Sequence, residues 1–128
     1  MFRNWATACI GLILGACSAS AVDSNIYIPP QVNVTYRAEL NESGTPVWTP
    51  DRTDVPAGAI VHATIQNALI DTHHFKVAGV TEEIVVNSNQ TITTEFQVPS
   101  SNPKLSVYCS LHDPNQTGTQ QDVVPPGN

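Results

Sequence analysis

Two residues three positions apart, Cys109 and His112, are the groups of this chain best suited to metal chemistry. Leu105, Val107 and Cys109 alternate as in a strand, so the thiol shares the core-facing side and stands at the strand's end. A thiolate and an imidazole at this spacing can point into one pocket, which suits a soft metal. A buried structural cysteine followed by a surface histidine gives the same pattern, so this stretch alone leaves both interpretations open.

A third candidate ligand lies upstream, where two histidines precede an apolar alternation. Phe75 and Val77 are the apolar residues of this short run and should face the core. His73 has their parity and is expected to point inward with them, whereas His74 points outward and is interpreted as a solvated residue or an outer neighbour of the site. His62 has the outward parity of its own run and is given no role.

The positions of the three cysteines favour a chemical role for Cys109. Cys9 and Cys17 lie in the N-terminal segment, which leaves Cys109 as the single thiol in the body of the protein. In an exported protein, paired cysteines would form disulfides. A cysteine without an intrachain partner in that compartment is expected to be reactive, paired with another molecule, or bound to a metal.

The elements that position these side chains are expected to be β-strands. After residue 31 no helical periodicity of useful length appears, and short runs of alternating apolar and polar residues are separated by turn residues. Seven to eight short strands are expected, spaced as in an all-β sandwich or barrel. Residues 50–58, with two prolines, are interpreted as a connection, and 119–124 as a strand too polar to be central. The expected strands cover 32–37, 47–49, 59–67, 72–77, 83–86, 91–98, 105–109 and 119–124.

Size and charge limit the class of protein. The 128 residues suit one domain. Five lysines and arginines against eleven aspartates and glutamates give a formal net charge of −6. This balance argues against nucleic acid or anionic lipid as an electrostatic partner.

The N-terminus has the features of a targeting segment. Residues 6–16 form an uncharged apolar run of signal-peptide length. The run ends in Leu14-Gly15-Ala16-Cys17, which resembles the lipobox of bacterial lipoproteins and implies that Cys17 is acylated and becomes the mature N-terminus. An ordinary signal cleaved near Ala19 or Ala21, leaving a soluble secreted protein, is the alternative.

Three segments follow from the lipobox interpretation. Residues 1–16 are expected to be the signal peptide, 17–30 the acylated N-terminus and a tether, and 31–128 the folded domain. The tether is small, polar and proline-ended, as linkers often are. The protein is then expected in the cell envelope, lipid-anchored to a membrane and facing the periplasm or the exterior.

Four motifs follow one another in the body of the chain. They are Val55-Pro56-Ala57-Gly58-Ala59 entering a strand, Asn67 before His73-His74-Phe75, the strand end Tyr108-Cys109, and Cys109-x-x-His112 with Gly118 beyond. In their order and spacing, from about residue 47 to 124, the chain resembles the cupredoxin family of small copper proteins. The resemblance implies a Greek-key β-sandwich that holds one copper ion at one end, with His73, Cys109 and His112 as the three close ligands.

The axial position departs from the family pattern. Members usually have a methionine shortly after the second histidine, but the one methionine here is Met1. Gln116 falls at the corresponding place, and some members use a glutamine there, so Gln116 is the candidate axial ligand. Thr117, a backbone carbonyl or no axial ligand at all are the alternatives. A glutamine oxygen is harder than a thioether and should lower the reduction potential.

The expected function is electron transfer rather than catalysis, because no open coordination position and no paired acid and base are visible. A periplasmic copper carrier or chaperone, or a metal-free β-sandwich interaction module, are the alternatives, and zinc accepts the same ligand types. The expected partner is a redox or copper-accepting protein of the envelope. We expect a monomer that meets the membrane only through its lipid anchor and binds no nucleic acid.

Overall fold

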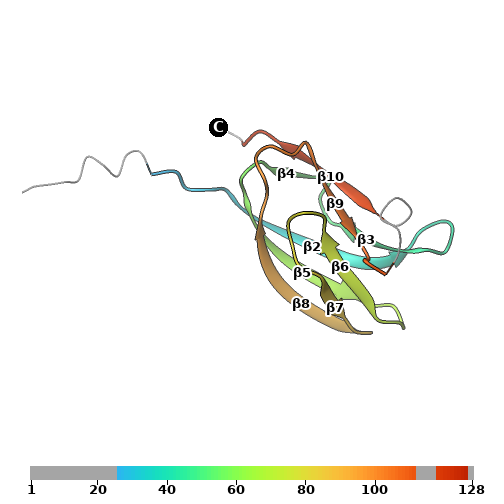
Figure 1. The fold of residues 1–128 in the computed structure, drawn as a ribbon. Helices are drawn as coiled ribbons and strands as arrows, with labels where there is room; N and C mark the ends of the chain where they lie inside the picture. The colour runs from blue at the N-terminus through green and yellow to red at the C-terminus, as the bar shows by residue number, and fades with distance from the viewer. Residues whose placement is uncertain (1–25, 112–117, 127–128) are drawn as a thin grey trace, which may run out of the picture.

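The computed structural model describes residues 26–111 and 118–126. In this part of the chain there are nine strands and no helix (Figure 1). Consequently, no helix within those residues is long and apolar enough to cross a membrane. The strands are β2 (Gln31–Leu40), β3 (Pro46–Pro50), β4 (Asp54–Pro56), β5 (Ile60–Asn67), β6 (His73–Val77), β7 (Ile84–Val86), β8 (Gln90–Gln97), β9 (Lys104–Tyr108) and β10 (Thr119–Val124).

The strands form two sheets that pack against each other. One has the order β4-β10-β9-β6-β7, and the other has the order β3-β2-β5-β8. The pairs β2–β5 and β4–β10 are parallel, and the remaining pairs are antiparallel. The predicted all-β sandwich is therefore confirmed.

The described residues contain nine strands, one more than the eight ranges expected from the sequence, and the additional strand is β4. It lies inside residues 50–58, which the sequence analysis interpreted as a connection. Only three residues long and ending in Pro56, it pairs in parallel with Asp122–Val124 of β10. It also forms the edge of its sheet, where a proline without an N–H is tolerated.

The expectation that residues 119–124 are too polar for a central strand is wrong. β10 lies between β4 and β9, so it has a neighbour on each side. Its inward residue Gln121 is fully buried. The Gln121 amide accepts a hydrogen bond from Tyr36 Oη (2.7 Å) and donates one to the Arg52 carbonyl (3.0 Å). With both ends of the amide paired, a polar side chain is compatible with the core.

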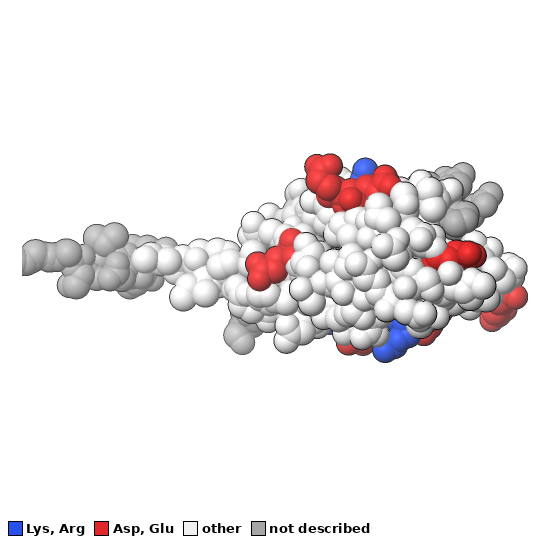
Figure 2. Space-filling model, turned by 90° about the horizontal axis from the view of Figure 1, so that it is seen from below, with Lys and Arg blue, Asp and Glu red and all other residues white. Residues whose placement is uncertain are grey.

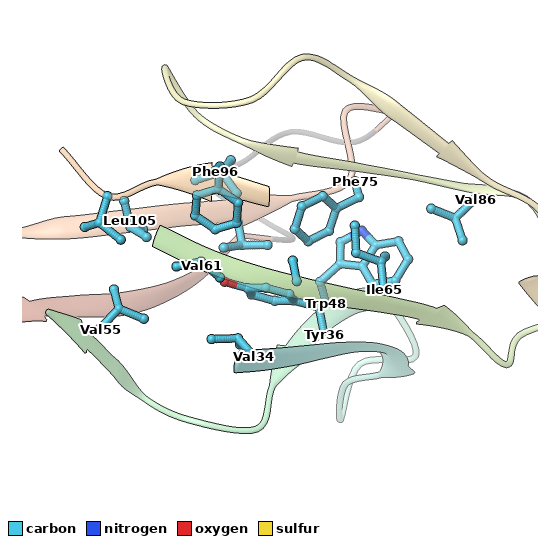
Figure 3. Packing of buried hydrophobic residues seen from close by; sticks show 14 of the residues in the cluster. Val34, Tyr36, Trp48, Val55, Val61, Ile65, Phe75, Val86, Phe96 and Leu105 are labelled. Atoms are coloured by element: carbon cyan, nitrogen blue, oxygen red, sulfur yellow. The ribbon is translucent and has the colours of Figure 1, made fainter. Parts of the chain in front are cut away.

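The core lies between the two sheets and is built from alternate strand positions. Phe75 stands near its centre, with the ring centroid of Tyr36 at 5.0 Å and that of Trp48 at 5.5 Å, both in edge-on geometry (Figure 3). The pattern confirms the inward faces expected from parity. Among the buried residues are Val34, Tyr36 and Ala38 of β2, Val61, Ala63 and Ile65 of β5, Phe75 and Val77 of β6, and Leu105 and Val107 of β9.

The two ends of the sandwich differ. Residues 26–30 run away from the domain at one end, where the Pro30 carbonyl accepts the Ile60 N–H at the start of β5 (Figure 1). β5 then runs eight residues to Asn67 near the opposite end, a span of roughly 23 Å at about 3.3 Å per residue. Figure 2 shows carboxylates at several separate places on one face, with few lysine or arginine side chains between them.

Candidate metal centre

His73 and Cys109 come from neighbouring strands of the five-stranded sheet. β6 begins at His73, and β9 ends one residue before Cys109. The two strands pair antiparallel through Lys76 with Tyr108 and Val77 with Val107. His73 is 5% exposed and Cys109 is 1% exposed, so both side chains face the interior as their parity predicted.

A hydrogen bond ties the sulfur to the start of β6. The backbone N–H of His74 donates to Cys109 Sγ over 3.3 Å. Because this nitrogen is bonded directly to the carbonyl carbon of His73, the sulfur lies beside the His73 backbone. The structure therefore brings together two of the predicted site residues, which are 36 positions apart in the printed sequence.

The loop before β6 is fixed by Asn67, a buried polar residue. Its side-chain Nδ2 donates to the carbonyls of Asp71 (2.8 Å) and Val86 (2.9 Å), and its Oδ1 accepts the N–H of Leu69 (3.0 Å). Val86 is the residue paired with His73 across β6 and β7. Asn67 thereby holds both the loop that enters β6 and the strand that pairs with His73.

His74 makes more contacts than the sequence analysis expected of an outward-facing residue. Its side chain is 18% exposed, and Nδ1 forms an ion pair with Glu83 Oε2. Ser110 Oγ lies 3.4 Å from the same nitrogen. On the other side of the residue, the His74 carbonyl accepts a hydrogen bond from Trp48 Nε1 (2.8 Å). Neither Trp48 nor Glu83 was identified from the sequence, because each reaches His74 through the fold rather than through a motif.

The remaining predicted site residues lie outside the described part of the chain. His112 and Gln116 fall in residues 112–117, together with the alternative axial residue Thr117, and Cys17 falls in residues 1–25. Among residues 26–111 and 118–126, no group of three or more His, Cys, Asp or Glu side chains is arranged to hold a metal ion. The described part thus contributes one thiol and one imidazole.

These two groups fit copper by their chemistry. A buried thiolate and an imidazole are ligands that copper and zinc both accept. The backbone N–H on Cys109 Sγ is also compatible with a metal-bound sulfur, because a thiolate accepts hydrogen bonds. His112, three residues after Cys109, is the next imidazole along the chain.

The other histidine of the described residues, His62, lies on the outer face of the four-stranded sheet. Its Nδ1 lies 2.9 Å from Glu95 Oε2, and its Nε2 lies 2.6 Å from Gln31 Oε1. The His62 side chain is 40% exposed. This agrees with its outward parity and separates it from His73 and Cys109, which face the core.

Comparison with known proteins adds one finding. No protein-family model matches the chain, and no curated protein matches its sequence. Among solved structures, the fold is similar to a multi-copper oxidase from Pseudomonas thermotolerans, with a TM-score of 0.54 and 11% sequence identity. The match covers 77% of this chain and 33% of the oxidase chain.

The fold is cupredoxin-like. At 11% identity the likeness shows the fold alone, and the chain spans one third of the length of the oxidase. The fold class expected from the sequence is confirmed.

Proposed function

We propose that this chain is a copper-binding electron-transfer protein of the cell envelope, with no catalytic activity of its own. His73, Cys109 and His112 hold one copper ion, which supplies a one-electron couple. The observation that supports the proposal is the His74 N–H to Cys109 Sγ contact, because it puts a buried thiol beside the backbone of His73, whose side chain is also buried. A Cys-His₂ donor set suits such a copper site.

The arrangement of the two ends supports an anchored carrier. Residues 26–30 leave the domain beside the start of β5, and His73 follows the far end of that strand (Figure 1). With Cys17 acylated, the copper end would point away from the membrane. A redox partner of the envelope would then reach the site without meeting the lipid surface.

Adding Cu(II) to the purified protein and recording its absorption spectrum tests the proposal. We expect intense visible bands from the thiolate–Cu(II) bond, and we expect them to be absent in Cys109→Ser. His62→Ala is the matched control, because His62 lies on the outer face, and its bands should equal those of the unmodified protein. A spectrum without visible bands would overturn the proposal and favour a metal-free interaction module.

A reversible redox couple separates an electron carrier from a copper carrier. The proposed function predicts that the copper form is reduced and reoxidised repeatedly without losing its metal. Rapid transfer of copper to a chelator of moderate affinity, together with an irreversible couple, would instead favour a chaperone.

For the axial position we propose Gln116. Replacing it by methionine exchanges an amide oxygen for a softer thioether, which stabilises Cu(I) and should raise the reduction potential. Redox titration of Gln116→Met beside Thr117→Ala measures the change. An unchanged potential in Gln116→Met would remove Gln116 from the site.

A further inference from the structure

Both backbone polar groups of His74, which belong to the two peptide groups on either side of its Cα, form hydrogen bonds to side chains. The N–H donates to Cys109 Sγ (3.3 Å), and the carbonyl accepts from Trp48 Nε1 (2.8 Å). Trp48 belongs to β3, in the sheet opposite the one that contains β6 and β9. The residue that donates to the sulfur is therefore fixed by a side chain that crosses the core.

The strand ladder does not perform this task on the β9 side. β6 pairs with β9 through Lys76 with Tyr108 and Val77 with Val107, and this pairing stops two residues short of His74. At His74 itself the backbone N–H donates to Cys109 Sγ. A small change in the backbone dihedral angles of His74 would lengthen this contact, so another group must restrict the His74 backbone.

Trp48 is well suited to define it. Its side chain is 1% exposed and packs edge-on against Phe75, the residue that follows His74. A buried indole has one N–H donor and few alternative partners, so the ring and the carbonyl restrict each other. On the solvent side, the ion pair between the His74 ring and Glu83 holds the same residue.

We propose that Trp48 is a positioning residue for Cys109: by holding the His74 carbonyl, it restricts the backbone dihedral angles of His74, keeps the N–H of the preceding peptide directed at the sulfur, and so tunes the thiolate–copper bond. The inference rests on the proposed copper site. Hydrogen bonding around the cysteine sulfur is one of the factors that set the reduction potential of such sites. A weaker hydrogen bond leaves more electron density on sulfur, which favours Cu(II) and lowers the potential.

Trp48→Phe tests the inference, with Tyr36→Phe as its matched control. Each substitution removes one buried hydrogen-bond donor beside Phe75, but Tyr36 donates to Gln121, whereas Trp48 donates to His74. The first readout is amide hydrogen exchange of His74 in the metal-free protein. The second is the thiolate–Cu(II) band and the reduction potential of the copper form.

Both variants lower global stability, so His74 exchange is compared with that of another buried amide, Ile65 of β5, in the same protein. In Trp48→Phe we expect the His74 amide to exchange about five- to tenfold faster relative to the Ile65 amide, the factor that one hydrogen bond is worth. We also expect the band to shift and the potential to fall. Tyr36→Phe should change neither this ratio nor the band. An equal ratio in the two variants, or an unshifted band in Trp48→Phe, would overturn the inference.

If Trp48→Phe fails to fold, incorporation of the benzothiophene analogue of tryptophan at position 48 preserves the ring volume and removes only the N–H. The same two readouts and outcomes then apply. Failure of the proposed function is distinguishable from failure of the inference. Suppose that the protein binds no copper, yet shows faster His74 exchange when the indole N–H is removed. That result would refute the copper site but retain the positioning of the His74 N–H by Trp48.

Discussion

Two clusters of buried polar groups lie in one core, and they are built from different chemistry. The first, here the Gln121 cluster, consists of Tyr36, Gln121 and the Arg52 carbonyl. The second, here the Cys109 cluster, consists of Cys109, His73 and the His74 peptide with its Trp48 donor. Phe75 lies between them, in ring contact with both Tyr36 and Trp48 (Figure 3).

The Gln121 cluster is made of neutral groups with complementary donors and acceptors. Burial raises the pKa of the Tyr36 phenol well above its ordinary value and outweighs the opposing effect of its hydrogen bond to Gln121. The phenol therefore stays neutral, as its role as a donor requires. None of these groups is a good ligand for a soft metal. We infer that the Gln121 cluster serves stability alone.

The Cys109 cluster combines a thiol and an imidazole, the two side chains that soft metals prefer. It also stands at an end of the sandwich, because β9 ends one residue before Cys109. The comparison teaches that burial of polar groups does not itself indicate function. The type of donor and its place in the fold distinguish the two clusters, and variants in each should affect different properties.

The largest effect is expected at His73. Replacing His73 by alanine removes a proposed close ligand. Loss of an outer-shell partner lowers metal affinity by about 10- to 100-fold, so the loss of copper affinity in His73→Ala should be larger than that. The visible band should disappear at equimolar copper. Competition with a chelator of known affinity measures the loss, with His62→Ala as control. Unchanged affinity in His73→Ala would contradict the ligand assignment.

Gln121→Leu should lower the stability of the fold and leave copper binding largely unchanged, the opposite of His73→Ala. The leucine removes the acceptor of the fully buried Tyr36 Oη and the donor to the part-buried Arg52 carbonyl. We expect the free energy of unfolding to fall by about 2–4 kcal/mol, since each unpaired buried group costs roughly 1–3 kcal/mol. Urea unfolding of the metal-free protein measures this. A copper spectrum that changes as much as in His73→Ala would contradict the separation of the two clusters.

Much of the fold could be predicted from the sequence, because alternation is a local signal. The inward positions of His73 and Cys109 follow from parity with their apolar neighbours, and burial confirms both. β4 was missed because three residues ending in Pro56 carry too short an alternation to recognise. Its pairing depends on β10, which lies about seventy residues later in the printed sequence.

The supporting contacts of the site could not be predicted in this way. The Trp48 indole bonds to a backbone carbonyl 26 residues away, and a carbonyl has no sequence signature. Gln121 is a partial exception, since its parity with Val123 indicates an inward side chain, and a buried amide must be paired. Its partner, Tyr36, is 85 residues away and becomes apparent only in the packed sandwich. The ligand roles of His112 and Gln116 stay predictions.

The smallest effect, and the most specific to the Gln121 cluster, is the pH dependence of Tyr36→Phe. At neutral pH the variant leaves Gln121 Oε1 unpaired and should be less stable by about 1–2 kcal/mol. The pKa of Tyr36 is raised in the folded state. Its contribution to the free energy of unfolding is therefore complete below the pKa of about 10 that the phenol has in the unfolded chain.

Above that pH the unfolded phenol loses its proton while the folded one keeps it. By pH 11 the free energy of unfolding of the unmodified protein should therefore fall by about 1.4 kcal/mol, and that of the variant should show no such loss. The difference in stability between the two proteins should nearly disappear. Urea unfolding of both proteins at pH 7 and pH 11 checks this, because the other ionising groups cancel in the difference. A stability gap of the same size at both pH values would mean that Tyr36 ionises as readily in the folded core as in water. The Gln121 cluster would then not be a closed, neutral network, and this property would no longer distinguish it from the Cys109 cluster.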